Sequence, residues 1–345
     1  MLEKTFGLLN DIPGGTYVPD EKKCYDDAEI EQLSQILKRL LWAPSQIRKK
    51  LQQAGVTIIP CNFYSEIPSI EDIERSFDAP VQNFDLIFDD SGMKEFLAEL
   101  HQFSHEFDPP REASGGGSYS WEGNPFSFSD AMAYYCMIRR YRPATIIEVG
   151  AGWSTLVAEL ALKANGAGEI ICIEPFPPEF LRGIDSVKTL IERPVQEIPP
   201  AFFNASLRDG DFLFIDSTHT VKHGSDCLHL YLSVLPRLSR SVFIHAHDIR
   251  LPATFPLNEL RDKHVYWTEQ YLLMAYLIDN SRTRVQYGST YHFLRNRQQL
   301  NAFMHGRFHA GGGSLWFSQK GALSAGRVSA SSQTSTLKSP QSFGT

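Results

Sequence analysis

Hydrophobic residues follow two different periods along the middle and C-terminal parts of the chain. Short runs rich in Ile, Val and Phe predict strands that are buried on both faces. These runs lie at residues 146–149, 169–174, 187–191, 211–216 and 241–248. Between them, apolar residues recur every three or four positions, which predicts helices. Strands that alternate with helices are typical of an α/β protein whose parallel sheet carries helices on both sides.

The N-terminal region has the helical period, and we expect a mostly helical cap over residues 1–110. The predicted helices lie at 26–42, 45–53, 70–77 and 94–107. One short apolar run, 56–59, predicts a strand that ends at Pro60. The charged residues of this region are typical of a solvated helix face. The cap can serve either as a lid or as a homodimer contact, and its sequence leaves both open.

A glycine-rich segment follows the cap. Residues 115–126 begin with three glycines and continue with Tyr119, Trp121 and Phe126. Loops that carry large side chains on flexible backbone often cover a binding site. This segment therefore predicts either a mobile lid or a simple linker between the cap and the core.

The C-terminal part of the chain predicts the edge of the sheet and then a tail. The runs 284–287 and 291–295 are expected to form a final antiparallel pair of strands. From about residue 318 the sequence is rich in Ser, Thr, Gly and Gln and has few bulky residues. Such a composition cannot bury enough apolar surface to fold, so we expect a disordered tail at 319–345. The core domain is then expected over 111–318.

Composition narrows the partners and the compartment. The net charge of −7 over 345 residues argues against a nucleic acid partner. The chain has no apolar run of about twenty residues, the length that a membrane span needs, and its N-terminus lacks a secretory pattern. The five cysteines are scattered and form no Cys-x-x-Cys pair, which is typical of reduced thiols. We expect a cytoplasmic protein.

A turn with two glycines joins the first core strand to the helix after it. Gly150 and Gly152 let the backbone approach a ligand closely, and a helix start at Ser154 and Thr155 aims N–H groups at that ligand. A nucleotide-like ligand fits, although Thr155 stands where the dinucleotide fingerprint has its third glycine. Glu174 ends the second strand, at a spacing suited to the two ribose hydroxyls. The alternatives are an ordinary tight turn and a solvated carboxylate.

Acidic and imidazole side chains follow two later strands. Asp216 and His219 come after one strand, and His247 and Asp248 come after another. Since ligands of open parallel sheets bind beyond the carboxyl ends of the strands, these side chains are expected to converge there. Carboxylates with one or two imidazoles suit Mg²⁺, Mn²⁺ or Fe²⁺, while either histidine is alternatively a general base. Each histidine can also be a hydrogen-bonded structural group.

These motifs together resemble the class I S-adenosylmethionine-dependent methyltransferases. The resemblance rests first on Ile-Glu-Val-Gly-Ala-Gly-Trp-Ser-Thr-Leu at 147–156 and on Ile-Glu-Pro at 173–175. Further segments resemble one bacterial branch of that family, and these lie at 64–68, 124–128, 213–226, 235–238, 247–252 and 267–273. The resemblance implies a Rossmann-like, doubly wound, mostly parallel sheet with an antiparallel last strand.

The resemblance also implies a role for each matching residue. Glu148, Gly150, Gly152 and Ser154 would hold the methionine part of S-adenosylmethionine. Glu174 would bind the ribose, and Gln196 would flank the adenine. Asp216 would lie near the sulfonium and the methyl acceptor.

Metal dependence is a further implication, and here the sequence departs from the pattern. The catechol-type relatives have an Asp-Asn pair after the later strand, where this chain has Asp248 followed by Ile249. His247 is the candidate replacement, so the metal ligands would be Asp216, His247 and Asp248, holding Mg²⁺ or another divalent cation. The candidate catalytic residues are Asp216, His219 and His247.

The function implied is O-methylation of a hydroxyl on a small, natural-product-like molecule. One alternative is a nicotinamide-dependent oxidoreductase, against which the absent third glycine counts. A second alternative is a non-catalytic binding module that keeps the methyltransferase fold. The acids and histidines at the strand ends count against that module.

Overall fold

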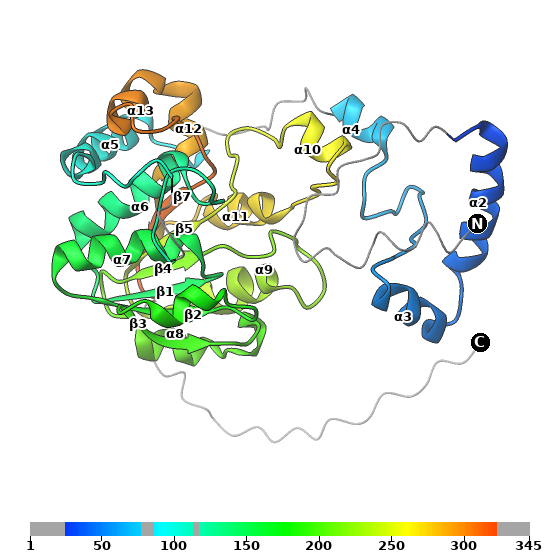
Figure 1. Ribbon diagram of the computed structural model, residues 1–345, viewed down its shortest axis with the longest axis horizontal. Helices are drawn as coiled ribbons and strands as arrows, with labels where there is room; N and C mark the ends of the chain where they lie inside the picture. The colour runs from blue at the N-terminus through cyan, green and yellow to red at the C-terminus, as the bar shows by residue number, and fades with distance from the viewer. Residues whose placement is uncertain (1–24, 77–85, 113–116, 323–345) are drawn as a thin grey trace. The chain divides into compact units, whose positions relative to one another are not determined.

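The computed structural model describes residues 25–76, 86–112 and 117–322 (Figure 1). The chain divides into two compact units. One comprises Met1–Asn83 with Arg250–Thr268, and the other comprises Phe84–Ile249 with Glu269–Thr345. This division differs from the expected boundary at residue 110. Most of the predicted tail, residues 323–345, lies outside the described residues.

The first unit contains short helices. They are α2 (Asp27–Leu41), α3 (Ser45–Gln53), α4 (Ile70–Ser76) and α10 (Leu257–Arg261). Asp26 and Glu29 begin α2 with a reciprocal capping box, which satisfies two of the free N–H groups at the helix start. The helices predicted near 26–42, 45–53 and 70–77 are therefore confirmed. The strand predicted at 56–59 is wrong, because these residues have no partner strand in the described part of the chain.

A seven-stranded sheet forms the centre of the second unit, with the order β3-β2-β1-β4-β5-β7-β6. The strands are β1 (Thr145–Val149), β2 (Glu169–Ile173), β3 (Val187–Ile191), β4 (Phe212–Ile215), β5 (Val242–Ala246), β6 (Thr283–Gly288) and β7 (Leu315–Gln319). Only β7 runs antiparallel to its neighbours, β5 and β6. The predicted α/β fold, a doubly wound and mostly parallel sheet with an antiparallel last strand, is confirmed.

Helices flank this sheet (Figure 1). They are α5 (Asp90–Ser104), α6 (Phe128–Tyr141), α7 (Trp153–Asn165), α8 (Pro200–Ser206), α9 (Asp226–His229), α11 (Glu269–Leu277), α12 (Ser289–Arg295) and α13 (Arg297–Met304). Helical turns of other types occupy Glu179–Gly183, Val195–Glu197, Leu230–Val234 and Leu235–Arg237. In the described residues, no helix is both long enough and apolar enough to cross a membrane.

One row of side chains across the sheet forms the core beneath α6. The strand register places Glu148, Cys172, Phe214 and His245 side by side, and all four are fully buried. Tyr134 of α6 covers the row, stacking on Phe214 at 4.7 Å between ring centroids. A carboxyl group and an imidazole in so dry a layer need hydrogen-bond partners, and both have one.

The C-terminal edge of the sheet corrects two predictions. Residues 291–295 belong to α12 and form no strand. The strand that pairs with β6 is β7. Its residues lie where the sequence predicted the end of the core domain and the start of the tail. Its run Leu-Trp-Phe is fully buried between β5 and β6, but it is only three residues long and polar residues follow it. So short a run gives too weak a periodic signal to distinguish a central strand from a loop.

Candidate active site

The turn after β1 is fixed by the neighbouring strand ends. Gly150 has φ +80°, and a Cβ atom placed on it would lie 2.0 Å from the main-chain oxygen of Asp216. Its N–H donates to the carbonyl oxygen of Ile173 at 3.0 Å. Gly150 therefore sits between the ends of β2 and β4, where only glycine fits. At Gly152, in contrast, an added Cβ would meet no atom of the described residues within 4 Å.

Glu148 supports the turn from below. Its carboxyl group accepts hydrogen bonds from Tyr134 Oη at 2.9 Å and from Thr155 Oγ1 at 2.5 Å. Burial raises the pKa of Glu148 to about 7, and the two hydroxyl donors offset part of that rise. Thr155 also accepts a hydrogen bond from the N–H of Gly152 at 3.1 Å, which ties Glu148 to the start of α7.

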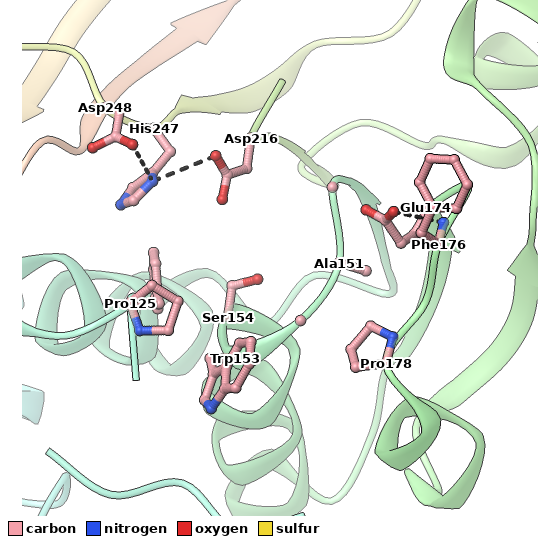
Figure 2. A pocket seen from close by; sticks show the side chains of 13 residues that line it. Pro125, Ala151, Trp153, Ser154, Glu174, Phe176, Pro178, Asp216, His247 and Asp248 are labelled. Atoms are coloured by element: carbon pink, nitrogen blue, oxygen red, sulfur yellow. Dashed lines mark hydrogen bonds and ion pairs between the residues drawn. The ribbon is translucent and has the colours of Figure 1, made fainter. Parts of the chain in front are cut away.

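A cavity of about 490 Å³ opens above this turn (Figure 2). Its volume lies in the usual range for small-molecule sites. Five of the seven predicted cofactor residues line it, namely Gly150, Gly152, Ser154, Glu174 and Asp216. The cavity continues from Glu174 at one end to His247 and Asp248 at the other.

Two cofactor candidates, Glu174 after β2 and Gln196 after β3, lie in different positions relative to the cavity. Glu174 accepts a hydrogen bond from the N–H of Phe176 at 2.8 Å, which holds its carboxylate at the cavity wall. Phe176 is 88% exposed, and it lines the cavity next to Glu174. Gln196 lies outside the lining set, and its amide donates to the carbonyl oxygen of Gly224 at 3.1 Å. The structure thus joins Glu174 to the cavity and leaves Gln196 on a neighbouring turn.

Four side chains converge at the other end, as the sequence predicted. His219 Nε2 lies 3.3 Å from Asp216 Oδ1 and 3.7 Å from Asp248 Oδ2. His247 Nδ1 lies 3.5 Å and 3.8 Å from the same two oxygens. Figure 2 shows Asp216, His247 and Asp248 facing one another across the cavity end. The strands β4 and β5 therefore present two carboxylates to two imidazoles.

Two of these four residues have unusual backbone conformations. His219 has φ +58° and Asp248 has φ +52°, both in the left-handed region. For residues other than glycine this conformation costs on the order of 1 kcal/mol each. Such strain persists only where the surroundings hold it, and it is frequent at functional sites.

Each imidazole has a second, buried acid behind it. His219 Nδ1 lies 2.8 Å from Glu269 Oε2, and His247 Nε2 lies 3.4 Å from Asp130 Oδ2. The sequence reading missed both acids. Asp130 lies in the first turn of α6, whose N-cap is Ser127. Glu269 is remote from His219 in sequence, so no local spacing points to the pair.

The charges in this cluster shift one another. Burial lowers the pKa of His219, but the hydrogen bonds to Asp216 and Glu269 raise it more, to about 10. The pKa of His247 is likewise raised well above the ordinary value for histidine. Burial lowers this pKa, but the charge of Asp216 and the other nearby acids raise it more. The pKa of Asp216 falls far below its usual range, since His247 and His219 outweigh its burial.

The same cluster has the chemistry of a cation site. Ligand atoms of Asp216, His219 and Asp248 all lie within 4.8 Å of one another. The buried Nδ1 of His247 has no hydrogen-bond partner among the described residues. The predicted ligand set named His247 where this grouping has His219, and both histidines face the same two acids. The four side chains suit a divalent ion that accepts mixed oxygen and nitrogen ligands.

The segment that the sequence offered as a mobile lid is built into the core instead. In its described part, Tyr119, Trp121 and Phe126 are all at most 3% exposed. Trp121 stacks on Phe308 at 5.6 Å between ring centroids. Phe126 lines the cavity, 5.1 Å from the ring of His247. Phe126 therefore forms part of the cavity wall, and the burial of Tyr119 and Trp121 anchors the segment.

The comparison with protein families matches the part of the chain that contains most of the residues lining the cavity. A family model described as a methyltransferase domain matches residues 147–249. An uncharacterized protein from Archaeoglobus fulgidus is 33% identical over 166 residues, which make up 44% of this chain and 75% of that protein. The matched domain includes every residue predicted to bind the cofactor.

Solved structures with a similar fold were also found. The plantazolicin methyltransferase BpumL in complex with SAH has 12% identity and a TM-score of 0.36, over 84% of this chain and 99% of that one. The O-methyltransferase TomG from Streptomyces achromogenes, in complex with SAM, has 14% identity and a TM-score of 0.32, over 73% and 96%.

Proposed function

We propose that this chain is an S-adenosylmethionine-dependent methyltransferase. The premise is that the chain belongs to the same family as the archaeal protein and carries a methyltransferase domain. The observation that carries the proposal is the single cavity that joins the glycine turn and Glu174 to Asp216. The turn brings the start of α7 to the cavity, and Glu174 offers a carboxylate for two ribose hydroxyls.

The reaction we propose is transfer of the methyl group to a hydroxyl oxygen of a small molecule. The O–CH₃ bond forms as the S–CH₃ bond breaks, the thioether leaves as S-adenosylhomocysteine, and the hydroxyl proton is released. Because the sulfonium is already a reactive donor, the protein contributes mainly by aligning donor, methyl group and acceptor in line. Asp216 is placed to do this, since it lines the cavity between the glycine turn and the imidazoles.

The residues present fit a divalent cation. The grouped ligand atoms of Asp216, His219 and Asp248 support this fit, and so does His247 Nδ1, which lies 3.5 Å from Asp216 Oδ1 and 3.8 Å from Asp248 Oδ2. These side chains would hold the ion, which when bound would lower the pKa of an acceptor hydroxyl. This extends the predicted set of Asp216, His247 and Asp248 by one imidazole.

The histidines themselves have a limited role as bases in the protein without an ion. Their raised pKa values mean that both keep their protons at neutral pH, and a protonated imidazole accepts no further proton. We therefore propose that the main role of His219 and His247 in the protein without an ion is to hold Asp216 and Asp248 in place. A base role for either would require that it loses its own proton.

The first experiment separates this proposal from its two rivals. Calorimetry with S-adenosylhomocysteine and with NAD should show micromolar binding of the first and none of the second. A nicotinamide-dependent oxidoreductase would give the reverse result. Incubation with methyl-labelled S-adenosylmethionine and a panel of phenols, catechols and sugars should then label at least one hydroxyl compound. Binding without any labelled product from a broad panel would favour the non-catalytic module.

A substitution tests the reacting end of the cavity. Asp216→Ala should reduce methyl transfer by at least about a hundredfold, since it removes the carboxylate that we propose aligns donor and acceptor. Its affinity for S-adenosylhomocysteine and its melting temperature should change little by comparison. Unchanged turnover in this variant would remove Asp216 from the mechanism.

A further inference from the structure

We propose that Glu269 is a positioning residue, which holds His219 so that Nε2 faces Asp216 and Asp248 and serves as a ligand of a divalent cation there. The inference rests on the proposed function and deepens it. It concerns a residue at the start of α11, remote in sequence from the strand ends that carry the site.

The contacts of Glu269 are the first argument. Its side chain is 1% exposed, and both oxygens are occupied. Oε2 accepts hydrogen bonds from Ser217 Oγ at 2.7 Å and lies 2.8 Å from His219 Nδ1. Oε1 accepts from Tyr231 Oη at 2.8 Å. Because the carboxylate can only accept, His219 Nδ1 must carry the hydrogen in this contact, which leaves Nε2 as the nitrogen turned toward the site.

The backbone of Glu269 provides the second argument. Its N–H donates to the carbonyl oxygen of His219 at 3.0 Å. The same residue thus holds His219 twice, once through the ring and once through the main chain. His219 has the strained φ of +58°, and a two-point attachment of this kind is what keeps such a conformation in place. The N–H of His219 also donates to Ser217 Oγ at 3.1 Å, which closes the ring of contacts.

The chemistry of the cluster is the third argument. A histidine that binds a metal usually donates its other N–H to a carboxylate or carbonyl, which fixes its ring and makes it a better ligand. His219 has this arrangement in full, with Glu269 on one side and the two acids on the other. Removing such an outer carboxylate typically lowers metal affinity by about 10- to 100-fold.

A purely structural role for Glu269 predicts a different result, and Tyr231 separates the two. Tyr231 is fully buried and donates to the oxygen of Glu269 that does not contact His219. Tyr231→Phe removes a hydrogen bond from the same carboxylate and leaves the His219 contact intact. It is therefore the matched control for Glu269→Gln.

The test is titration of the full-length protein with Mn²⁺ alone, by calorimetry, in the wild type, Glu269→Gln and Tyr231→Phe. Glu269→Gln should bind Mn²⁺ about 10- to 100-fold more weakly, and Tyr231→Phe should stay within about threefold of the wild type. Electron spin echo modulation of bound Mn²⁺ should show coupling to imidazole nitrogen, weakened by Glu269→Gln and by His219→Gln. Glu269→Asp, which keeps the charge, should recover part of the affinity.

The outcomes distinguish this inference from the proposed function. Equal Mn²⁺ affinity in the wild type and Glu269→Gln, equal losses in Glu269→Gln and Tyr231→Phe, or no Mn²⁺ binding at all would overturn the role of Glu269. Each leaves the methyltransferase proposal standing so long as the wild type binds S-adenosylhomocysteine. Loss of S-adenosylhomocysteine binding in the wild type would instead overturn the proposed function. Melting temperatures and S-adenosylhomocysteine affinity of the variants report whether each is folded.

Discussion

The two ends of the cavity are built in different ways. At the glycine end, the five consecutive residues Gly150 to Ser154, in the turn after β1 and the start of α7, line the cavity. The segment after β2 completes this end with Glu174, Phe176 and Pro178. At the acidic end, the groups that face one another are side chains, and they come from four separate parts of the second unit. Asp216 and His219 follow β4, His247 and Asp248 follow β5, Asp130 lies in α6 and Glu269 begins α11.

This difference teaches where each end is vulnerable. Backbone at the glycine end is packed between neighbouring strands, so a change there is felt by the whole sheet. At the acidic end, the groups that face one another are charged side chains at the cavity, so a change there acts on the bound ligand and on the charges that remain. Substitutions at the two ends should therefore separate stability from binding.

The largest expected effect is that of Gly150→Ala. A Cβ atom would lie 2.0 Å from the main-chain oxygen of Asp216, and the residue has a positive φ that alanine adopts poorly. The ends of β1 and β4 would have to separate, at a cost of about 4 kcal/mol or more. Chemical denaturation should show this loss, or the variant should fail to accumulate as folded protein.

Gly152→Ala is the matched control two residues along. Its φ is near 180° and no described atom lies within 4 Å of an added Cβ, so unfolding free energy should change by less than about 1 kcal/mol. Because Gly152 lines the cavity, affinity for S-adenosylhomocysteine should still fall. Equal destabilisation by the two substitutions would contradict the distinction between a packed glycine and an open one.

The same contrast explains which parts of the molecule the sequence could predict. The glycine turn lies in one local strand, turn and helix pattern, from which Gly150, Gly152 and Ser154 were identified. Glu174 was identified from its spacing to that turn, whereas Phe176 and Pro178, which also line the cavity, were not predicted. The acids and histidines after β4 and β5 were also found, because parallel strands bring their carboxyl ends together. Asp130 and Glu269 were missed because no spacing in the sequence indicates their contacts. The packing of α6 and α11 brings each acid to its histidine.

The fold shows a similar limit. The five parallel strands that open the sheet are short, and they could be placed from the sequence because runs rich in Ile, Val and Phe alternate there with helical patterns. The antiparallel edge could not, since β7 has only three buried bulky residues in a row and its partner β6 lies far from it along the chain. Likewise, Tyr119 and Trp121 looked like the side chains of a lid, because glycines precede them. Burial against Phe107 and Phe308 is a tertiary property that this pattern does not encode.

The next largest effect is a pH dependence that originates at Glu148. Burial raises the pKa of this carboxyl from the ordinary value of 4.5 to about 7, so between these values the folded protein holds a proton that the unfolded chain has lost. Its contribution to stability is therefore full below about pH 4.5 and decreases as the pH rises toward about 7. The total decrease is on the order of 3 kcal/mol.

Glu148→Gln isolates this contribution. The variant cannot ionise at this position, so the difference in unfolding free energy between wild type and variant should shift in favour of the variant as the pH rises from 4.5 to 7. Taking the difference cancels the titration of groups common to both proteins. Denaturation curves that keep the same separation across this range would show that Glu148 titrates normally.

The smallest effects compare two residues that the sequence treated alike. Glu174→Ala should weaken S-adenosylhomocysteine binding by at least about tenfold, because Glu174 lines the cavity and a charged hydrogen bond to the ribose is lost. Gln196→Ala should change that affinity by less than about threefold, because its amide is engaged with Gly224 on a turn outside the lining set. Glu174 is half-buried and Gln196 is exposed, so neither substitution should alter the melting temperature by more than a few degrees. Calorimetry would instead find equal losses of affinity only if Gln196 turned into the cavity when the cofactor binds. The adenine would then lie closer to the turn at Val195–Glu197 than the position of Glu174 indicates.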